Sequence, residues 1–301
     1  MLTGTSPRPG ESTVKRTASL LACILLPLWA ARAQPIFYPD GVLNNASYLD
    51  PSLPNSGLAR GGIFTVFGQG LGPASLARAA SFPLPLELAG TSIRVTVLRT
   101  TRDAIMLYAV DNQVGAILPS DTPEGEGTLT VTYQGQTNRF PARIRVVRRA
   151  FGIFTINQAG SGPGAITDAN FATNTLTNAQ QPGQIAILWG TGLGPVTFDE
   201  RTQPPGGVEQ LRIQPAPEVL VGGKLAPVLY AGRSPCCQGL DQVVFEVPRD
   251  SPEGCYVPVA VRSAGAVSNF ASMSISLRGK RCSIRRGFPK PIWRGRKPQE
   301  G

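Results

Sequence analysis

Short stretches of alternating hydrophobic and polar residues recur along the chain, and glycine, proline, aspartate and asparagine separate them. Segments that alternate with a period of two and are rich in β-branched and aromatic residues are predicted to form half-buried β-strands. A first set covers Gly41–Tyr48, Ile63–Phe67, Ser92–Leu98, Ile105–Val110, Gly115–Leu118, Thr128–Tyr133 and Arg143–Val147. A second set covers Ala165–Thr167, Ile185–Trp189, Glu218–Val221, Ala226–Tyr230, Gln242–Val247, Val257–Val261 and Ala271–Leu277. No stretch has a sustained helical period with caps, so the pattern predicts an all-β protein.

Two heptapeptides occur twice, in the same order. Phe67-Gly-Gln-Gly-Leu-Gly-Pro73 returns as Trp189-Gly-Thr-Gly-Leu-Gly-Pro195, and Pro119-Ser-Asp-Thr-Pro-Glu-Gly125 returns as Pro248-Arg-Asp-Ser-Pro-Glu-Gly254. The offsets are 122 and 129 positions, so a seven-residue length change lies between the motifs. This is an internal duplication, and six or seven short strands per copy are typical of a β-sandwich. We therefore predict two tandem β-sandwiches, at residues 34–150 and 151–282, and the family resemblance described below implies that they are immunoglobulin-like.

The glycines of the first motif superficially match a phosphate-binding loop. A dinucleotide fingerprint, however, needs a G-x-G-x-x-G spacing, a following helix and an acidic residue about 20 positions later. Here Gly72 comes one position early and Pro73 follows it. We interpret the motif as a sharp turn after a core strand, with glycines allowing positive φ. Phe67 and Trp189 are expected to pack between the sheets.

The second motif lies between two predicted strands, and its proline and glycine indicate a hairpin connection. Asp121 with Glu124, and Asp250 with Glu253, form two pairs of neighbouring carboxylates. Glycosidases use paired carboxylates, but in a cleft rather than in a solvated turn. Calcium would also suit these oxygens, although no D-x-D-x-D-G loop is present. We assign no catalytic, cofactor-binding or metal-ligating residue.

Charge is distributed unevenly over the 301 residues. The net charge of +10 comes from residues 1–33, with +3, and residues 278–301, with +8, whereas residues 34–277 carry −1. A nucleic-acid-binding domain carries its basic stripe on the folded surface, so this distribution argues against a nucleic-acid partner. The chain has no histidine, which excludes Ser-His-Asp and Cys-His catalysis and histidine-ligated zinc.

The N-terminus has the order of a secretory signal peptide. Lys15 and Arg16 precede the apolar run at 18–30, and the small residues of Ala31-Arg-Ala33 follow. We predict cleavage before Gln34, with a membrane anchor or a later start codon as the alternatives. No other stretch approaches 18 apolar residues, so no transmembrane segment is expected after cleavage. The basic tail at 283–301 is expected to be disordered or to attach to anionic lipid, glycan or nucleic acid.

Four cysteines remain after removal of Cys23 with the leader, and all four lie in the second copy. An even number in an exported chain predicts disulfides. Cys255 and Cys282 lie toward the same end of a predicted hairpin, whereas a strand of about 20 Å separates Cys237 from Cys255. We therefore favour Cys255–Cys282, which leaves a vicinal Cys236–Cys237 bridge by elimination. A Cys236–Cys237 loop that folds back would instead allow Cys237–Cys255. No C-x₂-C pair indicates zinc.

A family resemblance rests on motifs in the second copy. They are Pro182-Gly183, Trp189-Gly-Thr-Gly-Leu-Gly-Pro195, Pro217-Glu-Val-Leu-Val-Gly-Gly223, Tyr230-Ala-Gly232, Gly239-Leu-Asp-Gln-Val243 and Val247-Pro248, with the four cysteines. Over roughly 164–282 the chain resembles the Solibacter-type uncharacterised C-terminal domain of secreted acidobacterial proteins. The glycine-rich turn is also similar to IPT/TIG immunoglobulin-like domains. The resemblance implies export and an immunoglobulin-like sandwich, and it implies no activity and no catalytic residues.

These features together predict an exported, non-enzymatic binding or structural module in the periplasm, at the cell surface or outside the cell. Its expected partner is an unknown protein or glycan, without a cofactor. One alternative is a carbohydrate-binding or adhesion module, which would present an exposed aromatic platform. Another is a hydrolase using Asp or Glu, which would need a pocket that gathers two carboxylates. Specialisation is expected around the Cys236-Cys237 loop.

Overall fold

Alternating side chains place one hydrophobic row of each strand in a core. In β6 (Thr91–Val97), the side chains of Ile93, Val95 and Val97 are buried, and the intervening residues face outward. The computed structural model describes residues 1, 4 and 34–282. The rest of the predicted signal peptide and the basic tail at 283–301 lie outside the described residues.

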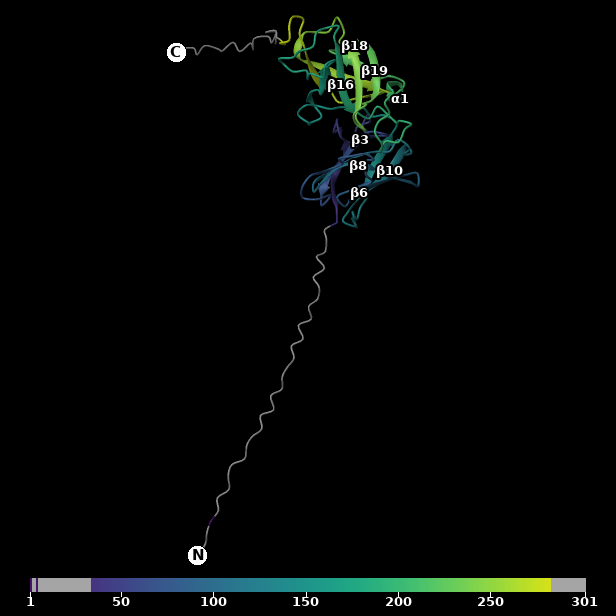
Figure 1. Cartoon of the computed structure of the whole chain (residues 1–301), viewed down its shortest axis with the longest axis vertical. Coiled ribbons are helices and arrows are strands. Elements are labelled where there is room, and N and C mark those ends of the chain that lie inside the picture. Colours follow the sequence, from purple (N-terminus) through teal and green to yellow (C-terminus); the bar gives the residue numbers. More distant parts are fainter. Residues whose placement is uncertain (2–3, 5–33, 283–301) are drawn as a thin grey trace, which may run out of the picture. The chain divides into compact units, whose positions relative to one another are not determined.

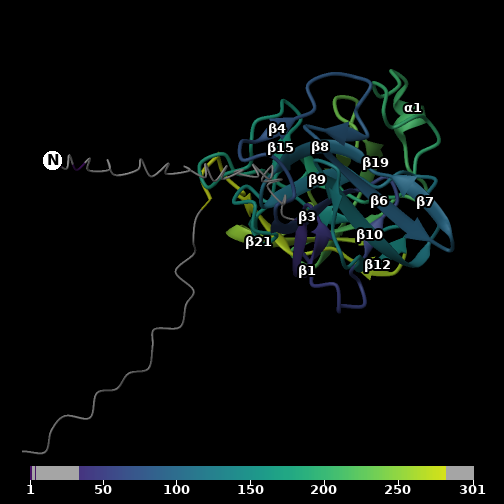
Figure 2. The same cartoon turned by 90° about the horizontal axis from the view of Figure 1, so that it is seen from below.

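The strands of the first half form two sheets (Figures 1 and 2). One has the order β1 (Ile36–Asn44), β3 (Ile63–Gln69), β9 (Gln113–Ile117), β8 (Ile105–Val110) and β4 (Ala77–Arg78). The other has the order β2 (Leu58–Ala59), β12 (Ala142–Val147), β10 (Gly125–Tyr133), β6 and β5 (Glu87–Leu88), with β7 (Thr100–Asp103) on β6 and β11 (Gln136–Thr137) on β10. We call this pair of sheets the first sandwich.

The second half repeats this arrangement, and we call its two sheets the second sandwich. One has the order β13 (Gly152–Ile153), β16 (Ile185–Thr191), β20 (Asp241–Glu246) and β19 (Val228–Arg233), with β15 (Ile166–Asp168) on β16. The other has the order β14 (Gly162–Pro163), β23 (Ala271–Ile275), β21 (Gly254–Ser263), β17 (Glu218–Val221) and β18 (Lys224–Ala226), with β22 (Ala266–Val267) on β21. A four-residue helix, α1 (Val208–Leu211), precedes β17.

The prediction of two tandem immunoglobulin-like sandwiches is confirmed. The order β1-β3-β9-β8 corresponds to β13-β16-β20-β19, and β12-β10-β6 corresponds to β23-β21-β17. One hydrophobic core draws its residues from 42–146 and another from 151–275. The predicted boundary at residue 150 falls between β12 and β13.

A third repeated sequence emerges from the register of the strands. Leu107-Tyr108-Ala109 and Leu229-Tyr230-Ala231 are also 122 positions apart, and the register shifts just before the tyrosine in both. A β-bulge therefore precedes the tyrosine at the same register position in each sandwich.

The seven extra residues of the second copy lie in one loop. Gln113 pairs with Val110 directly after a two-residue turn, whereas the equivalent Gln242 pairs with Gly232 beyond a much longer loop. That loop contains Cys236 and Cys237. The length difference between the copies is therefore the disulfide-bearing β19–β20 connection.

Several sequence predictions about local structure were wrong. The Pro-x-Asp-x-Pro-Glu-Gly segments are not hairpins, because β9 and β10, like β20 and β21, belong to different sheets. Phe67 and Trp189 lie outside the cores, since alternation puts them on the face opposite to the buried residues. Phe67 contacts Tyr48, and Trp189 contacts Phe171, with ring centroids 6.0 and 6.3 Å apart. The strand expected at 226–230 is divided between β18 and β19.

The glycines of the first motif have two distinct roles. Gly70 and Gly192 adopt positive φ of 66° and 97°, as predicted for a turn. Gly68 and Gly190 lie within strands, where a Cβ atom would approach Ile36 O to 2.1 Å and Gly152 O to 2.3 Å. The first glycine of each copy therefore permits the close approach of β1 or β13.

Candidate functional site

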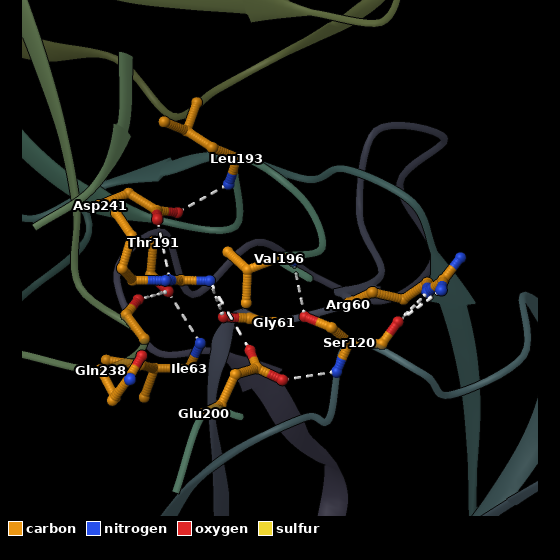
Figure 3. A network of polar contacts seen from close by, with 12 residues as sticks. Arg60, Gly61, Ile63, Ser120, Thr191, Leu193, Val196, Glu200, Gln238 and Asp241 are labelled. Atoms are coloured by element: carbon orange, nitrogen blue, oxygen red, sulfur yellow. Dashed lines mark hydrogen bonds and ion pairs between the residues drawn. The ribbon is translucent and has the colours of Figure 1, made fainter. Parts of the chain in front are cut away.

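A buried arginine joins the two sandwiches. Arg233, the last residue of β19, has no solvent exposure. Its Nη1 lies 2.8 Å from Asp241 Oδ1, and its Nη2 donates to Gly61 O of the first sandwich at 2.8 Å. Glu200 Oε1 lies 3.8 Å from the same Nη2. We call this set of contacts, with the backbone bonds around it, the junction network (Figure 3).

Both carboxylates of the junction network are buried. Asp241 Oδ2 accepts a hydrogen bond from Leu193 N at 2.8 Å, so the repeated Gly-x-Gly-Leu-Gly turn binds the acid directly. Burial raises the pKa of Asp241 to about 6, because desolvation outweighs the attraction of Arg233. Burial likewise raises the pKa of Glu200, against the opposing effect of Arg233.

The second repeated motif supplies the first sandwich's side of the network. Ser120 N donates to Glu200 Oε2 at 2.7 Å, and Ser120 Oγ accepts from Val196 N at 2.9 Å (Figure 3). Thr191 Oγ1 accepts from Ile63 N and donates to Gly239 O, both at 2.7 Å. The repeated segments therefore form the junction as well as turns, a role that sequence reasoning missed.

The β19–β20 loop places Gly239 in close contact with the first sandwich. Gly239 has a φ of +76°, and a Cβ there would approach Ile63 Cγ1 to 2.6 Å and Ile117 Cγ1 to 2.9 Å. The sequence feature that could have indicated the junction network is the pair of charged residues that flank the cysteine loop, Arg233 and Asp241. Charged residues at strand ends are usually solvated, and only the tertiary contacts bury these two.

The four cysteines form the two favoured pairs. Cys236 and Cys237 are bonded in the exposed part of the β19–β20 loop. Cys255 and Cys282 are bonded across the end of the second sandwich, with Cα atoms 5.2 Å apart. The vicinal bridge thus lies in the segment that carries Gln238 and Gly239 into the junction.

Three of the four carboxylates of the second motif lie in separate ion pairs. Asp121 lies 2.7 Å from Arg102 Nε, and Glu124 lies 3.1 Å from Arg60 Nη1. Asp250 pairs with Lys224 at 2.8 Å in the second sandwich. Glu253 Oε1 accepts a hydrogen bond from Leu277 N at 3.3 Å. Asp121, Glu124 and Asp250 are therefore partly exposed and engaged by cations, and Glu253 is engaged by a backbone N–H.

One cleft does gather acidic residues, beside the junction network. Its volume is about 740 Å³. The charged residues that line it are Arg60, Arg102, Arg148, Arg201, Asp103, Asp121, Asp199 and Glu200. The acids are engaged: Asp103 by Arg94, Asp121 by Arg102, Asp199 by the Arg201 N–H, and Glu200 by the Ser120 N–H. This cleft is balanced in charge, and its acids serve the fold.

A second cleft at the junction has a different lining. It has a volume of about 610 Å³, and both sandwiches line it. The first sandwich contributes Asn45, Ala46, Tyr48, Leu76, Arg78, Tyr108, Val110 and Gln113, and the second contributes Phe154, Thr155 and Gln158. We call it the junction cleft. No carboxylate is among these described lining residues.

A hydrogen-bonded tyrosine forms part of the junction cleft wall. Tyr108 OH accepts from Gln113 Nε2 at 2.8 Å and Asn45 Nδ2 at 3.0 Å, and it shares a hydrogen bond with Thr65 Oγ1 at 3.0 Å. The Tyr108 ring lies over Gly115, where a Cβ would approach its Cε1 to 2.1 Å. Burial, with a smaller contribution from Tyr108, raises the pKa of Tyr48. Tyr48 is therefore protonated at neutral pH.

Arg78 is the cation of the junction cleft. It lies in β4, exposed, and no ion pair of its guanidinium appears in the described part of the chain. Within residues 34–282, no group of three potential metal ligands gathers. Nor does this range contain a helix long and apolar enough to cross a bilayer.

Comparisons with known proteins give remote structural likenesses. No protein-family profile matches the chain, and no curated protein matches it. The chain is similar to SGBP-B from a xyloglucan utilization locus in Bacteroides uniformis, with 10% identity, a TM-score of 0.25, and coverage of 80% of this chain and 49% of that chain. It is also similar to the Bacteroides ovatus mixed-linkage glucan SGBP-B, with 11% identity, a TM-score of 0.30, and coverage of 73% and 43%. The chain is similar to the titin Ig tandem domains A164–A165 as well, with 9% identity, a TM-score of 0.19, and coverage of 73% of this chain and 91% of that chain. The chain thus spans about half the length of the two SGBP-B proteins.

Proposed function

We propose that this protein is an exported, non-enzymatic binding module that holds a glycan in the junction cleft. The observation that carries the proposal is the composite lining of this cleft, which both sandwiches form. The junction network fixes the two sandwiches against each other, so the two walls of the cleft keep their spacing. The predicted membership of the Solibacter-type family remains part of this proposal, as does export.

The chemistry of the lining favours a saccharide. Tyr48, Tyr108 and Phe154 offer aromatic faces, on which the C–H face of a sugar ring packs. Asn45, Gln113, Gln158 and Arg78 offer amide and guanidinium groups for sugar hydroxyls. A cavity of this size with aromatic walls and a few polar groups is typical of ligand sites.

The lining also favours binding over hydrolysis. A glycosidase needs two carboxylates beside the bond that it cleaves, and the junction cleft offers amides and one cation instead. The acid-rich cleft provides carboxylates that already bind arginines or backbone N–H groups. A bound glycan is therefore expected to be released unchanged.

A glycan array followed by calorimetry tests the proposal. We expect the purified protein to bind an oligosaccharide, and Tyr108→Phe or Arg78→Ala to weaken that binding at least tenfold, about 1.4 kcal/mol. Tyr256→Phe is the matched control, because Tyr256 is 60% exposed and lies outside the cleft. Binding that is insensitive to both cleft variants, or no glycan binding at high concentration, contradicts the proposal. Release of reducing sugar over time would indicate an enzyme instead.

A further inference from the structure

Strand β1 pairs with β3 in two parts. Its register shifts between Phe37 and Val42, so residues 38–41 leave the ladder. The second sandwich has the same interruption, where β13 and β15 pair with β16 on either side of a gap. Phe37 pairs with Gly68 as Ile153 pairs with the equivalent Gly190. The two gaps therefore correspond, but the second contains residues 154–165.

The longer connection of the second sandwich reaches across to the other sheet. Its residues Gly162 and Pro163 form β14, which pairs in parallel with Ala271 and Ser272 of β23. Gly164 N then donates to Ser272 O at 2.9 Å. The connection thus covers the edge of β23 at this point.

The equivalent edge of the first sandwich is uncovered. Gly125 pairs with Val146 as its repeat Gly254 pairs with Ile275. Counting back along each strand, Ala142 and Arg143 correspond to Ala271 and Ser272. Strand β2 covers only Val146 and Val147 of β12. Outside the ladder with β10, Arg143 makes no backbone hydrogen bond to the described part of the chain.

A cleft lies where the second sandwich places β14. Its volume is about 690 Å³, and its lining comes from residues 34–42, Pro51 and residues 138–143. We call it the edge cleft, because residues of β1 and β12 line it. Three large hydrophobic residues gather there with high exposure: Phe140 at 75%, Ile36 at 60% and Tyr38 at 43%. Such a concentration of exposed apolar side chains marks an interaction surface.

Two arginines border the edge cleft. Arg139 lies with its guanidinium carbon 5.3 Å from the centre of the Phe140 ring. Neither Arg139 nor Arg143 forms an ion pair with any described residue. Asp40 is the acid on the opposite rim. The β12 side of the cleft is therefore basic, and much of the remaining lining is apolar.

We propose that the edge cleft accepts an extended segment of a partner protein, which pairs in parallel with β12 at Ala142–Arg143. The segment takes the place that Gly162–Pro163 occupies in the second sandwich. Backbone hydrogen bonds to the free edge supply affinity, and alternate apolar side chains enter the cleft. An acidic residue of the segment lies beside Arg139 and Arg143. This surface is distinct from the junction cleft and independent of a glycan ligand.

The test uses the full chain and a phage-displayed library of random linear peptides of about twelve residues. A graft variant, in which residues 154–165 replace residues 38–41, serves for counter-selection, because its longer connection fills the edge in cis. We expect enriched peptides to carry alternating apolar residues with an acid. They should bind wild type at least tenfold more tightly than the graft, and should slow amide hydrogen exchange at 142–144.

Two further variants keep the test decisive if the graft misfolds. Arg143→Pro removes the edge N–H that the partner strand would use, and is expected to weaken binding at least tenfold, because edge strands tolerate proline but lose a donor. Arg94→Ala changes an exposed arginine of β6 and should leave peptide binding unchanged. Failure to enrich any peptide overturns the proposal. Enriched peptides that protect another region, or that bind Arg143→Pro equally well, also overturn it.

Discussion

Arg233 and Asp241 form the residue pair of the β19–β20 ladder that is nearest to the connecting loop. Arg233 Nη1 lies 2.8 Å from Asp241 Oδ1, and neither side chain is exposed. The pair lies between the sandwiches, where Gly61 O and Glu200 complete its surroundings. A charge removed from water is tolerated only while an opposite charge compensates it, so the loss of one partner of a buried pair is destabilising. This relationship determines how the junction responds to substitution and to pH.

Removal of one partner should be more costly than removal of both. We expect Arg233→Met or Asp241→Leu alone to lower the free energy of unfolding by about 3–5 kcal/mol, because each disturbs the charge balance of the buried network. Arg233→Met leaves Asp241 and Glu200 without a cation, and Asp241→Leu leaves Arg233 only the more distant Glu200, at 3.8 Å. The double variant should recover part of that loss. Urea denaturation measures these effects, with the exposed Arg94–Asp103 pair as control, at about 0–1 kcal/mol. A double variant as unstable as the sum of the single variants contradicts the expectation.

Stability should fall as pH rises from about 4 to about 7. The raised pKa of Asp241, about 6, means that the folded state binds this proton more tightly than the unfolded state, whose carboxyl has the ordinary value of 3.8. Below a pH of 3.8 this tighter proton binding adds about 3 kcal/mol to the free energy of unfolding. The added stability is lost as the pH rises through the folded-state pKa of about 6. Denaturation of wild type and Asp241→Asn across this range measures the difference. A stability difference between them that does not change with pH would refute the assignment.

The two disulfides should differ in their effect on stability. Replacement of Cys255 and Cys282 by serine should cost about 3–4 kcal/mol, because this bridge closes a separation of 27 residues. The same change at Cys236 and Cys237 constrains adjacent residues and should cost only about 1 kcal/mol by loop entropy. Thermal unfolding of both double variants measures the contrast. Peptide mapping without reduction checks the pairing, and a Cys237–Cys255 peptide would overturn it.

Gly115→Ala should disturb the junction cleft through Tyr108. The added Cβ would lie 2.1 Å from Tyr108 Cε1, so the ring has to move away from the sheet. We expect a loss of about 1–3 kcal/mol in stability, as for an overpacked site, with weaker glycan binding. Gly206→Ala is the matched control, because nothing lies within 4 Å of a Cβ there. Equal stability of the two variants would show that Tyr108 is free to relocate.

Much of the architecture could be predicted from the sequence. Short apolar segments such as Ile105–Val110 and Glu218–Val221 reproduce β8 and β17, because apolar runs of this length between turn residues favour strands. The repeated motifs indicated two equivalent sandwiches, since duplicated turns imply duplicated strand order. The cysteine spacing likewise led to both pairs found in the structure.

The candidate sites could not be predicted in this way. The junction cleft combines Tyr108 with Phe154, and the junction network joins Gly61 to Arg233 across 172 positions. Arg78 and Gln158 have nothing in their local sequence that marks them as neighbours of one cleft.

The sequence by itself determined most strands and the duplication and favoured one set of disulfide pairs, because these depend on periodicity and on short separations along the chain. Only the tertiary structure decided which turn residues became buried partners and which strand edge stayed open. The physical reason is that burial and charge pairing arise between segments distant in the chain. Their outcome depends on the lengths of the connections, which determine which strand edges meet. The interruption of the strand paired with β3 has four residues, whereas the equivalent interruption beside β16 has twelve.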